Sequence, residues 1–209
     1  MILYDCDIAP NPRRARMFIA EKEIDIETVF VDLGSGEHLK SPFIELNPKA
    51  SVPVLLLDNG TMLNESMAIS VYLDSVFPDN NLTGLDPIER AVIAIAQLDM
   101  DLNGLQAVAE CFRNSARGFA GRAIVGPIGY DQIPELAERG RSRVKLFFNS
   151  LNERLAKSNY IAGDRFTVAD ITAFISLEFA KFIKEKPSED AIHLQRWYSS
   201  IAQRKCAKV

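Results

Sequence analysis

The stretch that decides the fold begins Asn47-Pro48-Lys49-Ala50-Ser51-Val52-Pro53-Val54-Leu55-Leu56-Leu57-Asp58-Asn59-Gly60 and continues Thr61-Met62-Leu63-Asn64-Glu65-Ser66-Met67-Ala68-Ile69-Ser70-Val71-Tyr72-Leu73. Residues 54–57 are an apolar run between a proline and an Asp-Asn-Gly turn, which predicts a buried strand entering a hairpin. Residues 61–63 are then the returning strand. Apolar residues at helical spacing follow, so we expect a helix to begin at 64–66.

Two features of this stretch predict a binding site. Pro53 precedes a strand and lacks an N–H, and X-Pro bonds are the ones that adopt cis at appreciable frequency, so we expect a cis bond after Val52. The turn would leave the Val52 N–H and C=O free to pair with an extended peptide. Ser66 stands at a helix N-terminus, which attracts a carboxylate, and Glu65 offers a counter-charge to an amine. This combination favours a small zwitterionic peptide.

The motifs Asn47-Pro48, Val52-Pro53 and Glu65-Ser66-x-Ala68-Ile69-x-x-Tyr72-Leu73 resemble the glutathione-binding signature of cytosolic glutathione transferases. The resemblance covers essentially the whole chain and has bacterial, Nu-like and theta-like features. It implies that Val52 pairs with the cysteinyl backbone of glutathione and that Glu65 and Ser66 hold the γ-glutamyl end. The glutathione-binding positions expected from it are His38, Lys40, Ser51, Val52, Pro53, Glu65 and Ser66.

The segment Gly36-Glu37-His38 is similar to one in theta-like and Nu-like members, in which the histidine contacts the glycyl carboxylate of glutathione. Lys40 would add a second cation. Simpler interpretations exist for all of these positions. A histidine in a polar loop is ordinarily exposed, and Val-Pro and Glu-Ser pairs also serve as plain turn and capping residues.

Composition excludes several classes of protein. The 209 residues carry a net charge of −4 and are 47% hydrophobic, which is enough for one large or two small cores. The sequence has no stripe of basic residues, so we do not expect nucleic acid as a partner. A basic leader and an apolar run of about 18 residues are both lacking, so we expect a cytoplasmic protein without membrane attachment. The three cysteines lack C-x-x-C spacing, which argues against a disulfide framework and against a metal site.

The order of elements predicts two domains. Strand, helix, strand, then two strands and a helix resemble the thioredoxin-like half of a transferase, an α+β domain with a mixed sheet. We place this glutathione-binding domain at 1–78, a polar linker at 79–87 and an all-helical domain at 88–209. Helices are expected at 88–114 and 134–156 with a long loop at 118–131. A capping box, Thr167-Val168-Ala169-Asp170, starts a further helix and is interpreted as a folding device.

The loop Ala9–Pro12 is expected to hold the chemistry, because it joins the end of a strand to a helix N-terminus. A thiol has a pKa of about 8.5 and reacts as thiolate. Lowering that pKa by ~2 units requires about 2.7 kcal/mol of preferential thiolate stabilisation. Arg13 and Arg14, at the start of the helix, are interpreted as solvated charges.

No hydroxyl occurs between Asp5 and Pro12. The Pro10-Asn11 pair instead resembles bacterial Nu-like and related fungal members, so the Asn11 carboxamide is predicted to face the glutathione sulfur. Three alternatives stay open: Cys6 as the site of a mixed disulfide, the Tyr4 hydroxyl as donor, and Asn11 as an ordinary capping residue.

The predicted function is a dimeric glutathione transferase that conjugates the glutathione thiolate to a small hydrophobic electrophile. Leu102, Phe112 and Phe119 are candidates to line the site of this second substrate. Because Nu-like members favour disulfide chemistry, one alternative is a glutathione-dependent disulfide-bond reductase or peroxidase. Another is a non-catalytic regulatory or scaffolding protein that retains the fold. Glutathione enters as a substrate, and the homodimer is implied by the resemblance.

Overall fold

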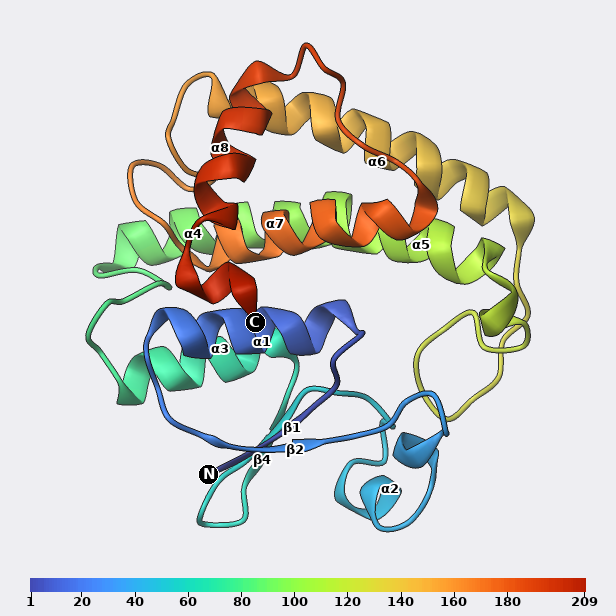
Figure 1. Ribbon diagram of the computed structural model, residues 1–209. Helices are drawn as coiled ribbons and strands as arrows, with labels where there is room; N and C mark the ends of the chain where they lie inside the picture. The colour runs from blue at the N-terminus through green and yellow to red at the C-terminus, as the bar shows by residue number, and fades with distance from the viewer.

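The computed structural model describes all 209 residues, with a sheet in the N-terminal part and helices stacked above it in the C-terminal part (Figure 1). The N-terminal part contains β1 (Ile2–Asp5), α1 (Pro10–Glu21), β2 (Glu27–Phe30), η1 (Glu37–Leu39), α2 (Phe43–Leu46), β3 (Val54–Leu56), β4 (Met62–Asn64) and α3 (Ser66–Val76). The C-terminal part contains α4 (Pro87–Asp99), η2 (Met100–Leu105), α5 (Gln106–Ser115), η3 (Arg117–Phe119), α6 (Pro134–Leu155), α7 (Val168–Ala180), η4 (Lys181–Ile183), α8 (Ile192–Ala202) and η5 (Lys205–Lys208).

The four strands form one mixed sheet in the order β2-β1-β3-β4, in which only the pairing of β1 with β2 is parallel. Since side chains alternate along a strand, Leu3 and Leu55 join the core that α1 and α3 cover, whereas Val54 packs with Phe43 of α2 in a separate small cluster. The predicted α+β domain with a mixed sheet and the all-helical second domain are thus confirmed.

The hairpin predicted from residues 54–63 is present, with Leu55 opposite Leu63. Gly60 has a φ of 83° in its turn, a conformation that favours glycine. The returning strand is displaced by one residue from the prediction, at 62–64. The Val52–Pro53 bond is cis, as expected, and a second cis bond, Ser41–Pro42, was not anticipated.

The predicted helix over 88–114 exists as a continuous run of three segments, because a π-helical stretch, η2, separates α4 from α5. Gly104 of η2 lies against Phe147 of α6, and an added Cβ would come within 2.5 Å of that ring. The glycine therefore allows α6 to pack closely here. None of the helices combines the length and the low polarity that crossing a membrane requires.

Helix α7 runs through the middle of the helical part (Figure 1) and is buried along nearly its whole length. Its predicted capping box is present: the Thr167 N–H and hydroxyl both donate to Asp170 Oδ2, at 3.0 and 3.2 Å. Asp170 Oδ1 accepts two more hydrogen bonds, from the Ile161 N–H at 2.9 Å and from Trp197 Nε1 at 2.8 Å. Asp170 thus fixes the start of α7 and also ties it to α8.

A buried ion pair holds the segment that follows α3. Lys22 Nζ donates to Asp74 Oδ1 at 2.5 Å, and each side chain is 1% exposed. Lys22 also donates to the Asp79 carbonyl, while Asp74 accepts from the N–H groups of Leu82 and Thr83. Both partners of this ion pair therefore hold the connection between the two parts of the chain: Lys22 binds it at Asp79, and Asp74 binds it at Leu82 and Thr83.

Candidate functional site

The loop before β3 is held from inside by Asn47. This side chain is fully buried, and its Nδ2 donates to the Ser51 carbonyl at 2.8 Å while its Oδ1 accepts the Lys49 N–H. The backbone N–H and C=O of Val52 form no hydrogen bond within the chain. A rigid loop therefore presents one unpaired peptide group next to the sheet, the arrangement that an added strand requires.

The junction of β4 and α3 is strained. Glu65 has a φ of 69° and a ψ of 121°, a combination that a side chain with a Cβ rarely adopts and that costs of order 1–3 kcal/mol. Glu65 is exposed, whereas Ser66, the first residue of α3, is 5% exposed. The Ser66 carbonyl accepts from the Ser70 hydroxyl at 2.9 Å, whereas the Ser66 hydroxyl makes no hydrogen bond within the chain.

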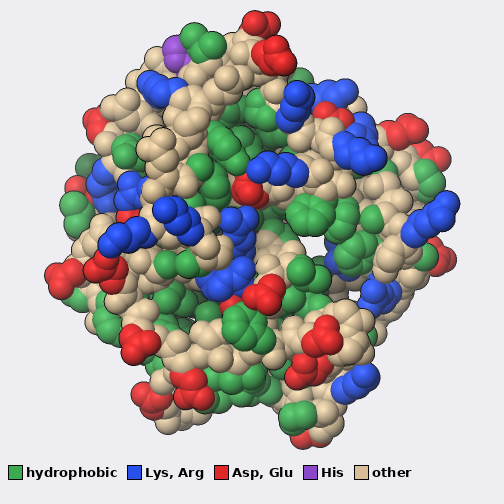
Figure 2. All heavy atoms as spheres, viewed as in Figure 1, with side chains coloured by type: hydrophobic (Ala, Val, Ile, Leu, Met, Phe, Trp, Pro, Cys, Tyr) green, Lys and Arg blue, Asp and Glu red, His purple; other side chains and the backbone are tan.

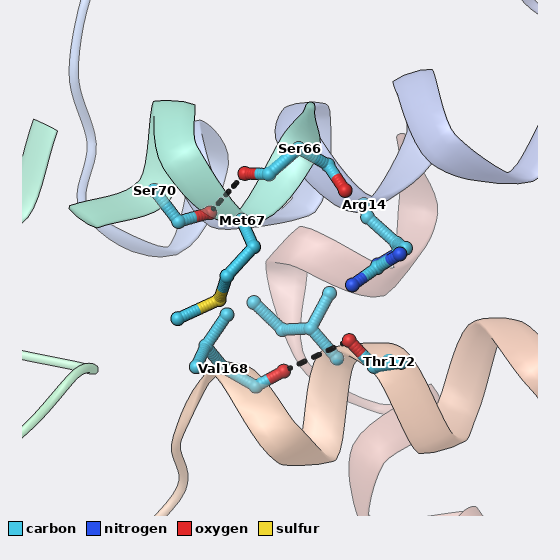
Figure 3. Close-up of a pocket in the computed structure, with 7 residues that line it drawn as sticks. Arg14, Ser66, Met67, Ser70, Val168 and Thr172 are labelled. Carbon is cyan, nitrogen blue, oxygen red and sulfur yellow. Dashed lines mark hydrogen bonds between the residues drawn. The ribbon is translucent and has the colours of Figure 1, made fainter. Parts of the chain in front are cut away.

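On one side, Ser66 faces the contact between the two parts of the chain (Figure 3). Arg14, Met67 and Ser70 lie with it against α7, and the Arg14 guanidinium points toward Thr172. The space that these residues enclose is too small for a water molecule. Ser66 is therefore closed off on this side, whereas its neighbour Glu65 is exposed.

The loop between β1 and α1 is clamped by Arg16, whose Nη1 donates to Asp5 Oδ1 at 2.7 Å and to the Cys6 carbonyl at 2.9 Å. Cys6 is 4% exposed. Tyr4 packs its ring edge-on to Phe43, with centroids 6.0 Å apart, and belongs to the α2 side of the sheet. Of the two alternative reactive residues, Cys6 is therefore buried and Tyr4 is partly buried against α2.

Asn11 lies in the first turn of α1 and is half-buried. Its Oδ1 accepts from Arg14 Nη1 at 3.0 Å, while its Nδ2 has no partner within the chain. Arg14, interpreted above as solvated, is instead only 6% exposed. That interpretation was wrong, because Arg14 lies on the face of α1 that meets the helical domain. Burial lowers the pKa of Arg14, and the Asp101 and Glu65 carboxylates oppose this shift.

His38 lies in the short helix η1, where its Nδ1 is buried without a hydrogen-bond partner. Burial, and secondly the positive charge of Arg122, lower the pKa of His38, so the imidazole is neutral at pH 7. Arg122 belongs to the long loop after α5, which also brings Gly126 against the Lys49 carbonyl. Lys40 is exposed and donates to the Ser35 carbonyl. Sequence reasoning did not identify Arg122, because no local pattern relates it to His38.

A cavity of about 510 Å³ opens beside the β1–α1 loop. Its other wall is α7 and η4, and its lining combines apolar and charged side chains: Asp7, Ile8, Ala9, Pro10, Arg13, Ile175, Glu178, Phe179, Lys181 and Phe182. Figure 2 shows the same face of the molecule hollowed between the sheet part and the helices, with hydrophobic side chains at the rim.

Phe112 stands behind this cavity. Its ring packs edge-on against Phe119, Phe179 and Phe182, with centroids 5.2, 5.4 and 5.8 Å apart. Two of the predicted second-substrate residues, Phe112 and Phe119, thus belong to the aromatic cluster that supports the wall. Leu102 is 49% exposed and is not part of the lining.

The Glu178 carboxylate in the cavity wall has several hydrogen-bonding and charged partners. Glu178 accepts hydrogen bonds from Lys181 and from the Tyr198 hydroxyl, and Arg13 Nη1 lies 3.6 Å away. Burial raises the pKa of Glu178, but these hydrogen bonds outweigh it and hold the pKa below its ordinary value. The cavity therefore has an apolar wall and, at one end, a group of charged side chains in which Glu178 is paired with Arg13 and Lys181.

Comparisons with known proteins agree with this arrangement. The family model "Glutathione S-transferase, N-terminal domain" matches residues 8–76, and "Glutathione S-transferase, C-terminal domain" matches residues 105–205. The chain is 34% identical to glutathione S-transferase 2 of Saccharomyces cerevisiae, over all of this chain and 88% of that protein.

Two solved structures are similar over nearly their whole length. A glutathione S-transferase domain-containing protein of Marinobacter aquaeolei has a TM-score of 0.89 and 38% identity, covering 99% of both chains. Gtt2 of Saccharomyces cerevisiae has a TM-score of 0.88 and 33% identity, covering 100% of this chain and 99% of its own.

Proposed function

Because the chain belongs to the glutathione S-transferase family, we propose that it binds glutathione at Val52 and Ser66 and transfers the thiolate to a small hydrophobic electrophile. The observation that carries this proposal is the unpaired Val52 peptide group, held rigidly beside the strained Glu65–Ser66 junction. The cysteinyl backbone would pair with Val52, and the γ-glutamyl carboxylate would meet the free Ser66 hydroxyl and the first N–H groups of α3.

The reaction needs a thiolate and a positioned electrophile. The Asn11 Nδ2 donor and the N-terminus of α1 would stabilise the thiolate, which lowers the pKa of the bound thiol. The sulfur attacks an electrophilic carbon, a C–S bond forms, and the leaving group departs with its electron pair. Protein residues stay unmodified, so the acceleration comes from thiolate stabilisation and orientation.

The cavity beside the β1–α1 loop is the site that we assign to the electrophile. Ile8, Phe179 and Phe182 give it an apolar wall, and pockets of this size and lining bind small hydrophobic molecules. Its position next to the first turn of α1, which carries Asn11, supports attack by a thiolate held there.

Conjugation is favoured over disulfide reduction through a protein thiol, since Cys6 is buried and its carbonyl is fixed by Arg16. Turnover of chlorodinitrobenzene, compared with that of hydroxyethyl disulfide, tests the choice. We expect conjugation to dominate, to fall with Asn11→Ala and to persist in Cys6→Ala. Dominant disulfide reduction, or loss of turnover in Cys6→Ala, would refute it.

A homodimer is proposed on the outer face of α4. Exposed apolar side chains recur there at helical spacing and continue into η2: Ile88, Val92, Ile95, Leu98 and Leu102. An apolar stripe of this kind marks an interaction surface. Light scattering of Ile95→Glu should report a monomer, whereas Ile128→Glu, an equally exposed change in the loop after α5, should leave a dimer. A dimeric Ile95→Glu variant would place the interface elsewhere.

A further inference from the structure

Arg14 reaches from α1 into the helical domain with both terminal nitrogens engaged. Its Nη1 donates to Asn11 Oδ1 at 3.0 Å and to Asp101 Oδ1 at 3.2 Å. Gln97, in the amide orientation that satisfies its neighbours, accepts from Arg14 Nη2 at 2.6 Å and donates to the Val168 carbonyl at 3.1 Å. A single buried guanidinium thus joins the Asn11 side chain, in the first turn of α1, to α4 and η2.

These contacts decide which way the Asn11 carboxamide points. Arginine has donors and no acceptor, so the group that faces it must be the amide oxygen. Because the carboxamide is planar, Nδ2 is then directed away from Arg14. This Nδ2 has no partner within the chain, and Asn11 is accessible to solvent. The contact with Arg14 therefore settles which atom of the Asn11 carboxamide is the oxygen and which is the nitrogen.

The helical domain supplies the other partners of Arg14. Asp101 lies in η2, the π-helical stretch, where the helical register changes by one residue. Its side chain is 33% exposed, and it is the only carboxylate paired with Arg14. Gln97 is 5% exposed and, in the same amide orientation, donates to the Thr172 hydroxyl of α7 at 2.8 Å. Arg14 is thus held from two helices of the second domain.

We infer that Arg14 is a positioning residue: Asp101 and Gln97 fix its guanidinium, which holds the Asn11 amide oxygen inward and turns the Asn11 N–H donors toward the substrate sulfur. This inference rests on the proposed role of Asn11. It adds that the thiol-activating donor in the N-terminal domain is aligned from the C-terminal domain.

Direct binding of the glutathione carboxylate by Arg14 is the competing role. The engagement of both terminal nitrogens by three protein acceptors argues against it, since a ligand would have to displace one of them. The absence of room for a water molecule between Arg14, Ser66 and α7 argues the same way. The two roles differ in their signature: a carboxylate ligand affects glutathione affinity, whereas a positioning residue affects the state of the bound thiol.

The test measures the pKa of enzyme-bound glutathione from its thiolate absorbance, together with glutathione Kd by calorimetry. The variants are Arg14→Lys, Asn11→Ala and the double variant. Lysine keeps the charge but cannot reach the three acceptors together. We expect Arg14→Lys to raise the pKa of the bound thiol by about one unit, the value of one charge-assisted hydrogen bond, with Kd changed less than about threefold.

The double variant gives the decisive comparison. If Arg14 acts through Asn11, then adding Arg14→Lys to Asn11→Ala raises the pKa no further. A full additional shift, or a Kd weakened tenfold with an unchanged pKa, would overturn the inference. An unchanged pKa in Asn11→Ala alone would instead show that the proposed role of Asn11 fails, and this inference with it.

Two further variants keep the test interpretable if Arg14→Lys does not fold. Asp101→Ala removes a partly exposed partner of Arg14 and should raise the pKa of the bound thiol in the same direction. Asp99→Ala is the matched control. Asp99 lies in the same helical run and pairs with Arg154, but it makes no contact with Arg14, so the pKa of the bound thiol should not change. Equal effects of the two substitutions would contradict the positioning role.

Discussion

Replacing Asp170 by alanine should destabilise the protein by about 5 kcal/mol. Asp170 accepts four hydrogen bonds, two from Thr167 and one each from Ile161 and Trp197. Each such bond to a buried charge contributes about 2 kcal/mol, because the donor is left unpaired when the carboxylate is removed. The sum is about 8 kcal/mol. Desolvation of the carboxylate opposes it and is strong enough to raise the pKa of Asp170 from 3.8 to about 6 in spite of these hydrogen bonds, so we expect a net loss smaller than this sum, about 5 kcal/mol.

Urea unfolding followed by fluorescence measures this loss directly, since Trp197 is the only tryptophan and donates to Asp170. A single transition is expected, because one cluster of 37 buried apolar residues spans both parts of the chain. Asp164→Ala is the control: this aspartate is exposed in the loop that precedes α7, and its loss should change stability by less than about 0.5 kcal/mol. A loss below about 2 kcal/mol for Asp170→Ala would refute the reasoning.

Three further predictions follow from the same contacts. Because the raised pKa of Asp170 disfavours its charged form in the folded protein, stability relative to Asp170→Asn should increase as the pH falls from 7 to 4, by at most about 3 kcal/mol; a flat difference in urea midpoints would contradict this. Asp74→Ala should lose about 3–5 kcal/mol by leaving the Lys22 charge buried and unpaired, and Lys22→Met in that background should recover part of it. Ser66→Ala should weaken glutathione binding about tenfold in calorimetry, the loss of one charge-assisted hydrogen bond; an unchanged Kd would remove Ser66 from the site.

The sequence predicted features that depend on near neighbours in the chain. The hairpin at 54–64, the cis bond before Pro53 and the capping box at Thr167 each follow from a few adjacent residue types. Local rules suffice for these because a turn or a cap is stabilised by groups within a few residues of it. The free Val52 peptide group belongs to the same class.

Features that depend on packing between distant segments were not predicted. Arg13 and Arg14 are adjacent and chemically identical, yet Arg13 holds the carbonyls of Ala207 and Val209 while Arg14 is buried against Asp101. Both contact the helical part, and which of them is buried there depends on how α1 is rotated against α7. The cavity wall formed by Phe179 and Phe182 was missed for the same reason, since only the docking of α7 brings it to the β1–α1 loop.

The two parts of the chain therefore contribute differently to the candidate site. The N-terminal part supplies the groups proposed to grip glutathione, and their positions depend on local turns that a short sequence specifies. The C-terminal part supplies Asp101 and Gln97, which hold Arg14 from α4 and η2, and the aromatic wall on α7. Since a π-helical stretch carries Asp101, a one-residue change in helical register there would move this carboxylate away from Arg14. If Asn11 activates the thiol as proposed, that activation depends on the packing of a helix that does not itself touch Asn11.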